Sequence, residues 1–346
     1  MKRIINWTQI KKLPAPQGYK ENIGVSNMLC GMLEDKIILG GGANFPIHPL
    51  DGGSRTEHNY LYLIKAIDNT FKIIDSTMLE KPIADGKVVV FNNIMFYVGG
   101  NRILKINVIN NKLHISEYFT LPFEIKNCIA HQFEGTIYYG LGSIDGKVTN
   151  RMFSFNIYTR ENIELSPFPA TERTQAVSEI FYDDIVVFSG GNSIAYTDGY
   201  KFNVRKKMWQ TISDVEANNK KISLLGAAAT KINSEEMLVI GGFDAEIWKN
   251  AVHKLSTLEG EEKQKFREFY FKQDYSYYNW NKEMLIYNYT KDEWKSIGEI
   301  SFKAPCSHAL INNGLNIYSI MGEIRPGERT PNIHRVSLQQ INEELN

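Results

Sequence analysis

Apolar residues along this chain cluster in short runs separated by polar turns and glycines. The recurring unit is an apolar strand, a tight turn, a second apolar strand ending in glycine, and a polar loop. Turn sequences such as NN, DD and NNG are typical of β-hairpins. Repetition at a period of roughly 40–80 residues indicates a propeller or a solenoid. The six copies are MLEDKIILGGG (32–42), VVFNNIMFYVGG (89–100), HQFEGTIYYGLG (131–142), EIFYDDIVVFSGG (179–191), TKINSEEMLVIGG (230–242) and ALINNGLNIYSIMG (309–322).

Further alternating runs follow most of the glycine ends, including YLYLIKAI, RMFSFNIY and EMLIYNYTKDEW. Each unit then has enough strands for a four-stranded antiparallel blade, so we predict an all-β fold, a six-bladed kelch-type β-propeller spanning residues 1–346 as a single domain. An irregular β-sandwich is the alternative, but it would not explain six copies in phase. The segment WTQIKKLP (7–14) resembles the last strand of a blade whose other strands end the chain. Such a strand would close the ring and cover exposed sheet edges.

One segment departs from the β pattern. Residues 256–280, STLEGEEKQKFREFYFKQDYSYYNW, begin with charged helix formers and end in aromatic residues. We expect a short helix there, inserted in the fifth blade. A solvated excursion is the simplest interpretation, but the density of aromatic side chains suggests that the segment packs against something.

Composition narrows the function classes. The net charge is zero, with 39 basic and 39 acidic residues, so nothing favours binding to nucleic acid or to an acidic membrane surface. No apolar run approaches the roughly 20 residues that a membrane helix needs. The start, MKRIINWTQIKKLP, lacks the apolar core of a secretory signal, and three separated cysteines argue against a disulfide framework. We therefore expect a cytoplasmic protein; its oligomeric state is left open.

The segment GEIRPGERT (322–330) places acid and base groups beside rigid turn residues, directly after a strand-like run. Pro326 and Gly327 would turn the loop and hold Glu323 near Arg325 and Arg329. A carboxylate in such a place can act as a general base, and guanidinium groups bind a substrate carboxylate in a planar, bidentate way. A salt-bridged surface hairpin is the alternative, and such ion pairs contribute little to stability.

These motifs resemble those of a known family. In one cyclic order, GTIYYGLGS (135–143), PFPATERTQA (167–176), GGFDAEIWKNAV (241–252) and GEIRPGERT are similar to the sialic acid (N-acetylneuraminate) mutarotases, which are six-bladed kelch-type propellers. The order of the blades here resembles a cyclically permuted branch of that family. The resemblance covers essentially the whole chain. It implies an isomerase of carbohydrate metabolism that interconverts the α and β anomers of N-acetylneuraminate by acid–base ring opening and closure.

The resemblance also implies roles for individual residues. Glu323 would be the catalytic base, and Arg329 would act beside it. Substrate binding would involve the arginines and loop residues Arg325, Arg173, Asn44, Phe45, Ser143 and Gln175. For the last four, turn formation is the ordinary alternative. Ring opening needs no metal, nucleotide or redox cofactor, and the expected partner is a small sugar acid.

Other side chains and other functions rank lower. Arg55 and His58 are expected to be loop or rim residues, with contact to a ligand as the alternative. His131 and His308 show no metal-ligand spacing and suit structural roles. Cys30, Cys128 and Cys306 suit small core positions. A non-catalytic kelch interaction module is the main functional alternative, since a fold alone does not determine function. A sialidase is disfavoured because its Ser-x-Asp-x-Gly-x-x-Trp repeats are absent, and no Tyr, Cys and His set suggests a copper oxidase.

Overall fold

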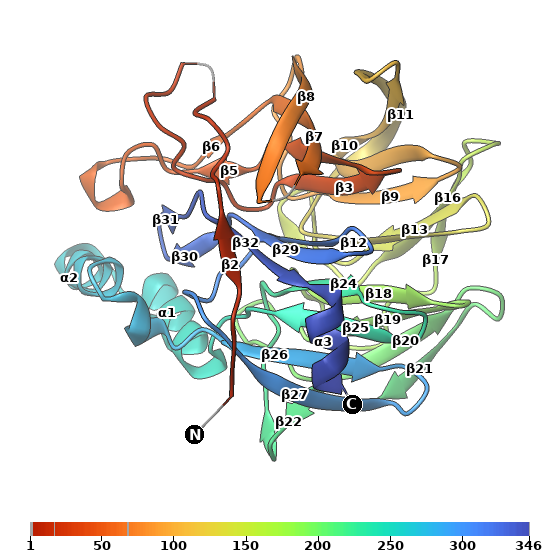
Figure 1. Ribbon diagram of the computed structural model, residues 1–346. Coiled ribbons are helices and arrows are strands. Elements are labelled where there is room, and N and C mark those ends of the chain that lie inside the picture. Colours follow the sequence, from red (N-terminus) through yellow and green to blue (C-terminus); the bar gives the residue numbers. More distant parts are fainter. Residues whose placement is uncertain (1–2, 17, 68, 346) are drawn as a thin grey trace.

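The chain forms a β-propeller, as predicted. The computed structural model describes residues 3–16, 18–67 and 69–345, and its strands within these ranges build six blades (Figure 1). Helices are confined to a few short segments. Within the described ranges, no helix combines the length and the apolar character needed to cross a membrane. The expectation of a six-bladed all-β fold is therefore confirmed.

The blades follow one another along the chain. The first contains β3 (Leu29–Leu33), β4 (Lys36–Gly40), β7 (Tyr60–Ile67) and β8 (Thr70–Met78). The second contains β9 (Lys87–Phe91), β10 (Ile94–Ile109) and β11 (Lys112–Lys126). The third contains β12 (Ile129–Phe133), β13 (Thr136–Gly140), β16 (Met152–Asn156) and β17 (Asn162–Leu165). The fourth contains β18 (Val177–Phe181), β19 (Asp184–Phe188), β20 (Gly199–Asn203) and β21 (Met208–Ile212).

The last two blades include strands from the start of the chain. The fifth contains β24 (Ala228–Lys231), β25 (Glu236–Ile240), β26 (Glu283–Asn288), β27 (Glu293–Ile300) and β1 (Ile4–Ile5). The sixth contains β28 (Ala309–Asn312), β29 (Asn316–Ile320), β32 (Ile333–Ser337) and β2 (Thr8–Ile10). Helix α3 (Leu338–Leu345) follows β32 and buries Ile341.

Residues 4–10 join the last two blades. Strand β1 pairs in parallel with β27, and β2 pairs antiparallel with β32, beside which it runs in Figure 1. Between them, buried Trp7 donates its backbone N–H to Ser301 Oγ at 3.0 Å. The strand expected at residues 7–14 is thus shorter, at Thr8–Ile10, and β1 was not foreseen.

Short excursions decorate one face of the ring. Successive strands of a blade alternate in direction, so the connections between second and third strands leave from the same face as the linkers between blades. Those connections carry most of the added hairpins and helices. The hairpins on these connections are β5 (Ala43–Asn44) with β6 (Thr56–Glu57), β14 (Ser143–Ile144) with β15 (Lys147–Val148), and β30 (Glu323–Arg325) with β31 (Glu328–Arg329). The short helix η1 (Pro49–Asp51) lies between β5 and β6. A further hairpin, β22 (Glu216–Ala217) with β23 (Lys220–Lys221), lies on the linker before β24.

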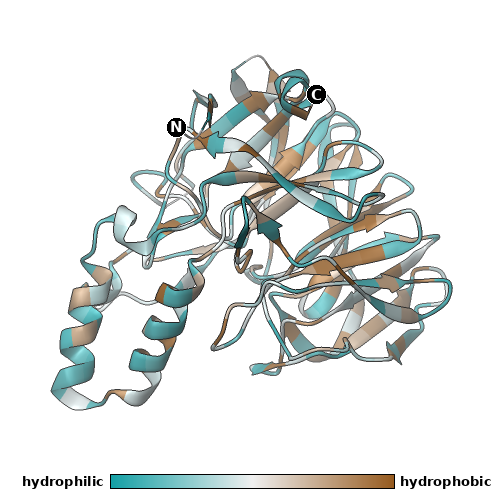
Figure 2. Ribbon diagram, turned by 90° about the horizontal axis from the view of Figure 1, so that it is seen from below, coloured by the Kyte–Doolittle hydropathy of each residue, from teal (hydrophilic) through white to brown (hydrophobic). Residues whose placement is uncertain are grey.

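The helical insertion lies in the fifth blade, between β25 and β26, but is longer than expected. It consists of α1 (Ala245–Thr257), α2 (Gly260–Phe271) and η2 (Tyr275–Tyr278), and Figure 2 shows the helical pair standing out from the blades. The predicted start at about residue 256 is wrong. The Asp244 side chain caps the first helix by accepting from two backbone N–H groups, a signal within FDAEIWKNAV that was not used.

Apolar side chains fill the spaces between neighbouring blades. One cluster, for example, combines Leu29 and Leu63 of the first blade with Met95 and Ile106 of the second, all at most 2% exposed. Because each blade packs on the next, no blade has a complete core of its own.

Six described residues, one before the first strand of each blade, form a closed ring of backbone hydrogen bonds around the channel. We call this ring the belt. Each N–H donates to the carbonyl of the preceding blade's residue, at N···O distances between 2.6 and 3.3 Å. All six have positive φ, between 51° and 77°. Its members, in order of donor to acceptor, are Asn27, Ser307, Gly226, Gln175, Asn127, Asp85 and again Asn27.

The glycine pairs that end the second strands pack against the backbone beside the belt. A Cβ atom at Gly142 would lie 2.2 Å from the carbonyl oxygen of Lys126, and one at Gly242 would lie 2.6 Å from that of Ser223. Both glycines also have positive φ, 76° and 117°. The repeated glycines therefore allow the second strand of each blade to approach the belt.

The belt yields a stability prediction at Asn127, whose φ is 53°. A β-branched side chain tolerates this conformation poorly, so Asn127→Val should lower the free energy of unfolding by about 1–3 kcal/mol. Asn127→Gly removes the same amide but fits a positive φ, and should change it by less than about 1 kcal/mol. Urea unfolding of both variants measures the difference. Equal losses would show that the backbone conformation at the belt carries no strain.

Candidate active site

The position of Glu323 follows from the repeat. The residue before the belt residue pairs with the residue that follows a positive-φ glycine at the end of the second strand. The pairs are Ser26 with Ala43, Thr174 with Gly191, and Cys306 with Glu323. In the sixth blade, Cys306 and Glu323 exchange both backbone hydrogen bonds, at 2.8 and 2.9 Å. Glu323 is therefore held beside the belt, where two other blades have a side chain of one carbon or none.

The turn chemistry of GEIRPGERT then brings Arg329 opposite Glu323. Strands β30 and β31 form a hairpin in which these two residues are cross-strand partners. Arg329 Nη1 donates to Glu323 Oε1 at 2.8 Å, and the backbone N–H of Gly327 donates to the same oxygen at 3.2 Å. The side chains are only 7% and 16% exposed, respectively. The predicted acid–base pair is thus a partly buried ion pair, not a solvated surface contact.

Arg329 is positioned by the first blade as well as by its own hairpin. Its Nε donates to Ser26 Oγ at 3.2 Å, and its guanidinium lies over the Phe45 ring, 4.9 Å from the ring centre. Within the described residues, Nη2 has no hydrogen-bond partner. Arg329 therefore retains donor capacity while its orientation is fixed.

The electrostatics of Glu323 combine opposing effects. Burial raises the pKa of its carboxyl above the ordinary value of 4.5, and this effect prevails over the charge of Arg329 and the Gly327 hydrogen bond, which lower it. The charge of Arg55 lowers it further. The carboxylate is consequently a stronger base than an ordinary glutamate while still having a cation beside it.

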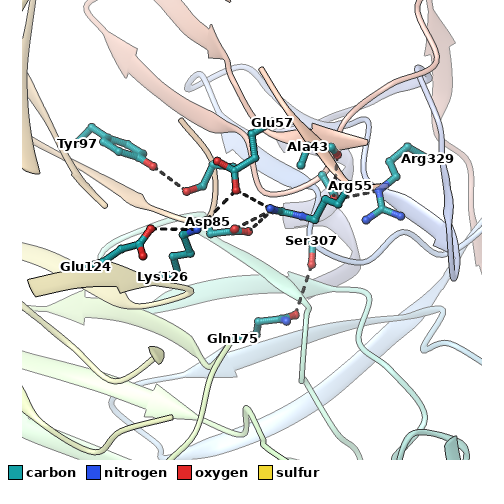
Figure 3. Close-up of polar contacts among 12 residues, drawn as sticks. Ala43, Arg55, Glu57, Asp85, Tyr97, Glu124, Lys126, Gln175, Ser307 and Arg329 are labelled. Atoms are coloured by element: carbon teal, nitrogen blue, oxygen red, sulfur yellow. Dashed lines mark hydrogen bonds and ion pairs between the residues drawn. The ribbon is translucent and has the colours of Figure 1, made fainter. Parts of the chain in front are cut away.

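A second charged network borders the site on the first and second blades (Figure 3). Arg55 donates from Nη2 to both oxygens of Asp85, at 2.7 and 2.8 Å, and from Nη1 to Glu57 at 2.6 Å. Lys126 lies 3.1 Å from Glu124 and 3.7 Å from Glu57. Asp85 is a belt residue, so this network is anchored on the same ring as Glu323. The sequence favoured a loop or rim position for Arg55 over contact with a ligand; in the structure its charge also lowers the pKa of Glu323.

The predicted loop residues of the first blade are near the site, and Gln175 belongs to the belt. Buried Asn44 donates to the Gly24 carbonyl at 2.9 Å and lies 2.9 Å from His58 Nε2, so its polar atoms are used within the protein. Gln175 Oε1 accepts from Ser307 Oγ at 3.4 Å, across the belt (Figure 3). Phe45 contacts Arg329 directly.

The remaining predicted residues are placed differently. Ser143 lies in β14, paired with the end of β11, away from the Glu323 hairpin. Arg325 Nε pairs with Glu328, and its Nη1 donates to the Gln273 carbonyl at 3.1 Å, so it holds the helical insertion. The structure brings neither residue into contact with Glu323.

Arg173 is enclosed in the fourth blade. It is 1% exposed, binds both oxygens of Asp198, and donates to the carbonyls of Thr171 and Ser189, each at 3.0 Å. The rings of Phe168 and Tyr196 lie against its guanidinium, 4.6 and 4.4 Å from the ring centres. Because these partners use its donors, Arg173 stabilises the fourth blade in the free protein.

Sequence reasoning missed Tyr270, at the end of α2. Its pKa is raised first by burial and then by Tyr278 and Glu323. The segment just after α2 is bound to the Glu323 hairpin, because Arg325 donates to the Gln273 carbonyl. The aromatic density of residues 256–280 was the available signal, and it was interpreted only as packing.

The other titratable residues that the sequence singled out lie in buried surroundings. Burial lowers the pKa of His131 and of His308 to about 3, and raises those of Cys30 and Cys128 to about 12. His131 Nε2 lies 2.8 Å from Ser178 Oγ. In the part of the chain that the structure describes, no group of three or more His, Cys, Asp and Glu side chains could hold a metal.

Two arginine–carboxylate pairs of similar geometry differ in burial, so comparing them shows how much burial adds to the stability contributed by the pair. Arg173 with Asp198 is 1% exposed on the arginine side, whereas Arg151 with Glu164 is 42% exposed and also lies over an aromatic ring, that of Phe153. Arg173→Met should lower the free energy of unfolding by about 1–3 kcal/mol, because it removes several hydrogen bonds of a buried guanidinium, including the one to the buried Ser189. Arg151→Met should cost at most about 1 kcal/mol. Chemical denaturation tests both; similar losses would contradict a structural role for Arg173.

Comparison with known proteins identifies the family of the chain. Residues 118–345 match the family model described as N-acetylneuraminate epimerase. An N-acetylneuraminate epimerase of Vibrio vulnificus (strain YJ016) is 25% identical over 227 residues, and one of Salmonella enteritidis PT4 (strain P125109) is 30% identical over 232 residues. Each match covers 62% of this chain, and the chain spans 57% and 56%, respectively, of the length of these relatives.

A solved structure described as "Structure of YjhT" is similar in fold. It matches with a TM-score of 0.56 and 21% identity, over 63% of this chain and 64% of that one. The family match includes the strands that carry Glu323 and Arg329. The chain belongs to the N-acetylneuraminate epimerase family.

Proposed function

We propose that the protein is a mutarotase that interconverts the α and β anomers of N-acetylneuraminate. The observation that carries this proposal is the Glu323–Arg329 pair, partly buried beside the belt in a chain of this family. Glu323 would remove the proton of the anomeric hydroxyl, so that the ring opens to the ketone. Closure on the other face of the carbonyl gives the second anomer. A positioned base of this kind typically contributes about 10²–10⁴-fold.

Arg329 would hold the substrate carboxylate. Its guanidinium has a planar arrangement of donors that matches a carboxylate, and Nη2 has no partner among the described residues. Arg55, whose charge reaches Glu323, is the second cation at this site. Arg325 and Arg173 are weaker candidates because Glu328, Gln273 and Asp198 use their donors.

We further propose that the blades are kelch-type and cyclically permuted relative to the family. In a permuted chain, a linear sequence alignment can match only those blades that occur in the same order in both proteins. The match begins at Tyr118 and includes the third to sixth blades but not the first strands of the chain, which supports this order. A cytoplasmic location and independence from cofactors stay predictions.

Activity is tested by following the exchange of the two anomers of N-acetylneuraminate by NMR. Wild-type protein should accelerate equilibration without consuming the sugar. Glu323→Gln should fold normally and lose at least about a hundredfold in rate, the low end for one acid–base group. In the matched control Glu328→Gln, on the same hairpin but 39% exposed, the rate should be unchanged.

The rate of anomer exchange should depend on pH through the protonation of Glu323. A base must be deprotonated, so kcat/KM should fall as the pH drops through the pKa of Glu323. Because burial raises that pKa, this limb should lie above pH 4.5. Exchange at the spontaneous rate with folded wild-type protein would refute the activity and favour a binding module. Near-normal rates for Glu323→Gln would instead assign the base to another residue.

The carboxylate contact is tested at Arg329. Arg329→Lys keeps the charge but loses the planar fork, so binding of the free acid should weaken by roughly 1.5–3 kcal/mol, as for a charge-assisted hydrogen bond. The methyl ester of the sugar should bind the variant and the wild type equally. Arg160→Lys, at an exposed turn, is the control and should behave as wild type. Calorimetric titration with acid and ester decides; unchanged affinity of Arg329→Lys for the acid would exclude this clamp.

A further inference from the structure

The helical insertion is fixed against the hairpin that carries Glu323. Arg325 of β30 donates to the carbonyl of Gln273, just after α2, and η2 contacts β30. On the other side, the ring of Phe271 in α2 packs edge-to-face on His48 of the first-blade loop, 6.2 Å between ring centres. The end of α2 is therefore held between the sixth and the first blades, which also provide Glu323 and Arg55.

Tyr270 occupies this end of α2 with a fixed ring. It is 8% exposed and packs against Phe266 and Tyr278, with ring centres 5.7 and 5.4 Å away. The Tyr278 hydroxyl donates to the Tyr270 backbone carbonyl, which fixes the main chain at this residue. The ring can therefore present its hydroxyl in a defined direction.

The hydroxyl of Tyr270 is free to bind a ligand. Among the described residues it has no hydrogen-bond partner, and it is not one of the enclosed polar atoms, so it stays accessible. A phenol in an aromatic cluster usually satisfies its hydroxyl when buried, as Tyr278 does. Tyr270 lies three residues before Gln273, whose carbonyl accepts from Arg325 on the hairpin that carries Glu323. Burial first, then the Tyr278 phenol and the charge of Glu323, raise the pKa of Tyr270. Tyr270 is thus protonated at neutral pH and can act as a donor.

We propose that Tyr270 is the proton donor to the sugar ring oxygen, the acid that complements Glu323 in the proposed mutarotation. In ring opening, Glu323 takes the proton of the anomeric hydroxyl while the carbonyl forms. The bond between the anomeric carbon and the ring oxygen breaks, and that oxygen takes the phenol proton. Closure reverses both transfers after rotation about the bond to the carbonyl carbon. No atom or electron is gained or lost.

The other donors at the site are less suited to this step. Arg329 and Arg55 do not release a proton under physiological conditions, so they can orient and neutralise charge but not cycle a proton. Lys126 is ion-paired with Glu124 and Glu57. Tyr278 already donates its hydroxyl to the Tyr270 carbonyl, so Tyr270 is the better placed of these two phenols to donate to a ligand.

This inference rests on the proposed function. Anomer exchange measured in wild type, Tyr270→Phe and Tyr277→Phe distinguishes failure of the proton-donor role from failure of the mutarotase activity. Tyr270→Phe keeps the ring packing, so its melting temperature should be close to that of wild type. Its kcat should fall by about a hundredfold or more, the range for one acid–base group, with KM changed less than about threefold. Tyr277→Phe removes a neighbouring hydroxyl of the same insertion and should keep wild-type kcat and KM.

Each outcome is decisive for Tyr270. Wild-type protein that exchanges anomers, together with undiminished kcat in Tyr270→Phe, overturns the proton donor and leaves the mutarotase standing. A raised KM with unchanged kcat also overturns it, because the hydroxyl then only binds. Inactive wild-type protein removes both proposals. If Tyr270→Phe melts early, Tyr278→Phe, which loosens the same backbone, provides the comparison: equal kcat in the two variants would refute a specific role for the Tyr270 hydroxyl.

Discussion

The closed belt of backbone hydrogen bonds is the constraint on which the rest of the structure depends. Each of its six members both donates and accepts, so the ring has no free end among the described residues. A missing blade would leave one buried N–H and one carbonyl without partners, at a cost comparable to lost hydrogen bonds. Strands β1 and β2, which pair with the fifth and sixth blades, hold these two blades together and so help to keep the belt closed. Together they connect the two ends of the chain into one ring.

The belt also explains how a repetitive fold can hold a distinct side chain at one of its equivalent positions. The bridge beside it recurs with Ala43, Gly191 and Glu323 at the same backbone position. The backbone geometry at that position is common to these blades, and the side chain differs. A carboxylate placed there binds Arg329, which in turn contacts Ser26 and Phe45 of the neighbouring blade. The fold thus supplies the position, while individual residues supply the function.

Parts of this arrangement could be predicted because they depend on local patterns. Alternating strands, hairpin turns and glycine pairs indicated the blades, and the Pro-Gly turn of GEIRPGERT indicated that Glu323 and Arg329 face each other. The belt was harder to foresee. Asn27, Asp85, Asn127 and Gly226 are residue types that tolerate positive φ, but Gln175 and Ser307 are not strongly marked for it. Its bonds join residues of different blades, which no local pattern shows.

The arginines show the same limit for the site. Arg173 and Arg329 both follow turns or loops and both have side chains that are at most 7% exposed, and their sequences gave no reason to separate them. What separates them is the partner: Asp198 and two carbonyls take the donors of Arg173, whereas Arg329 retains one terminal nitrogen. Arg55 was undervalued for the converse reason, since Asp85, which holds it, is 30 residues away in the sequence. Such pairings are decided by tertiary structure.

The two opposing influences on Glu323 then acquire a function in the proposed reaction. Burial makes the carboxylate more basic, and Arg329 makes it less so. A substrate carboxylate that binds Arg329 shares the cation and weakens its hold on Glu323. The basicity of Glu323 would therefore rise when the sugar is bound, next to the hydroxyl that must lose a proton. In the free protein the same ion pair keeps a buried carboxylate from standing alone, which would be costly. One arginine can thus stabilise the empty site and activate the occupied one.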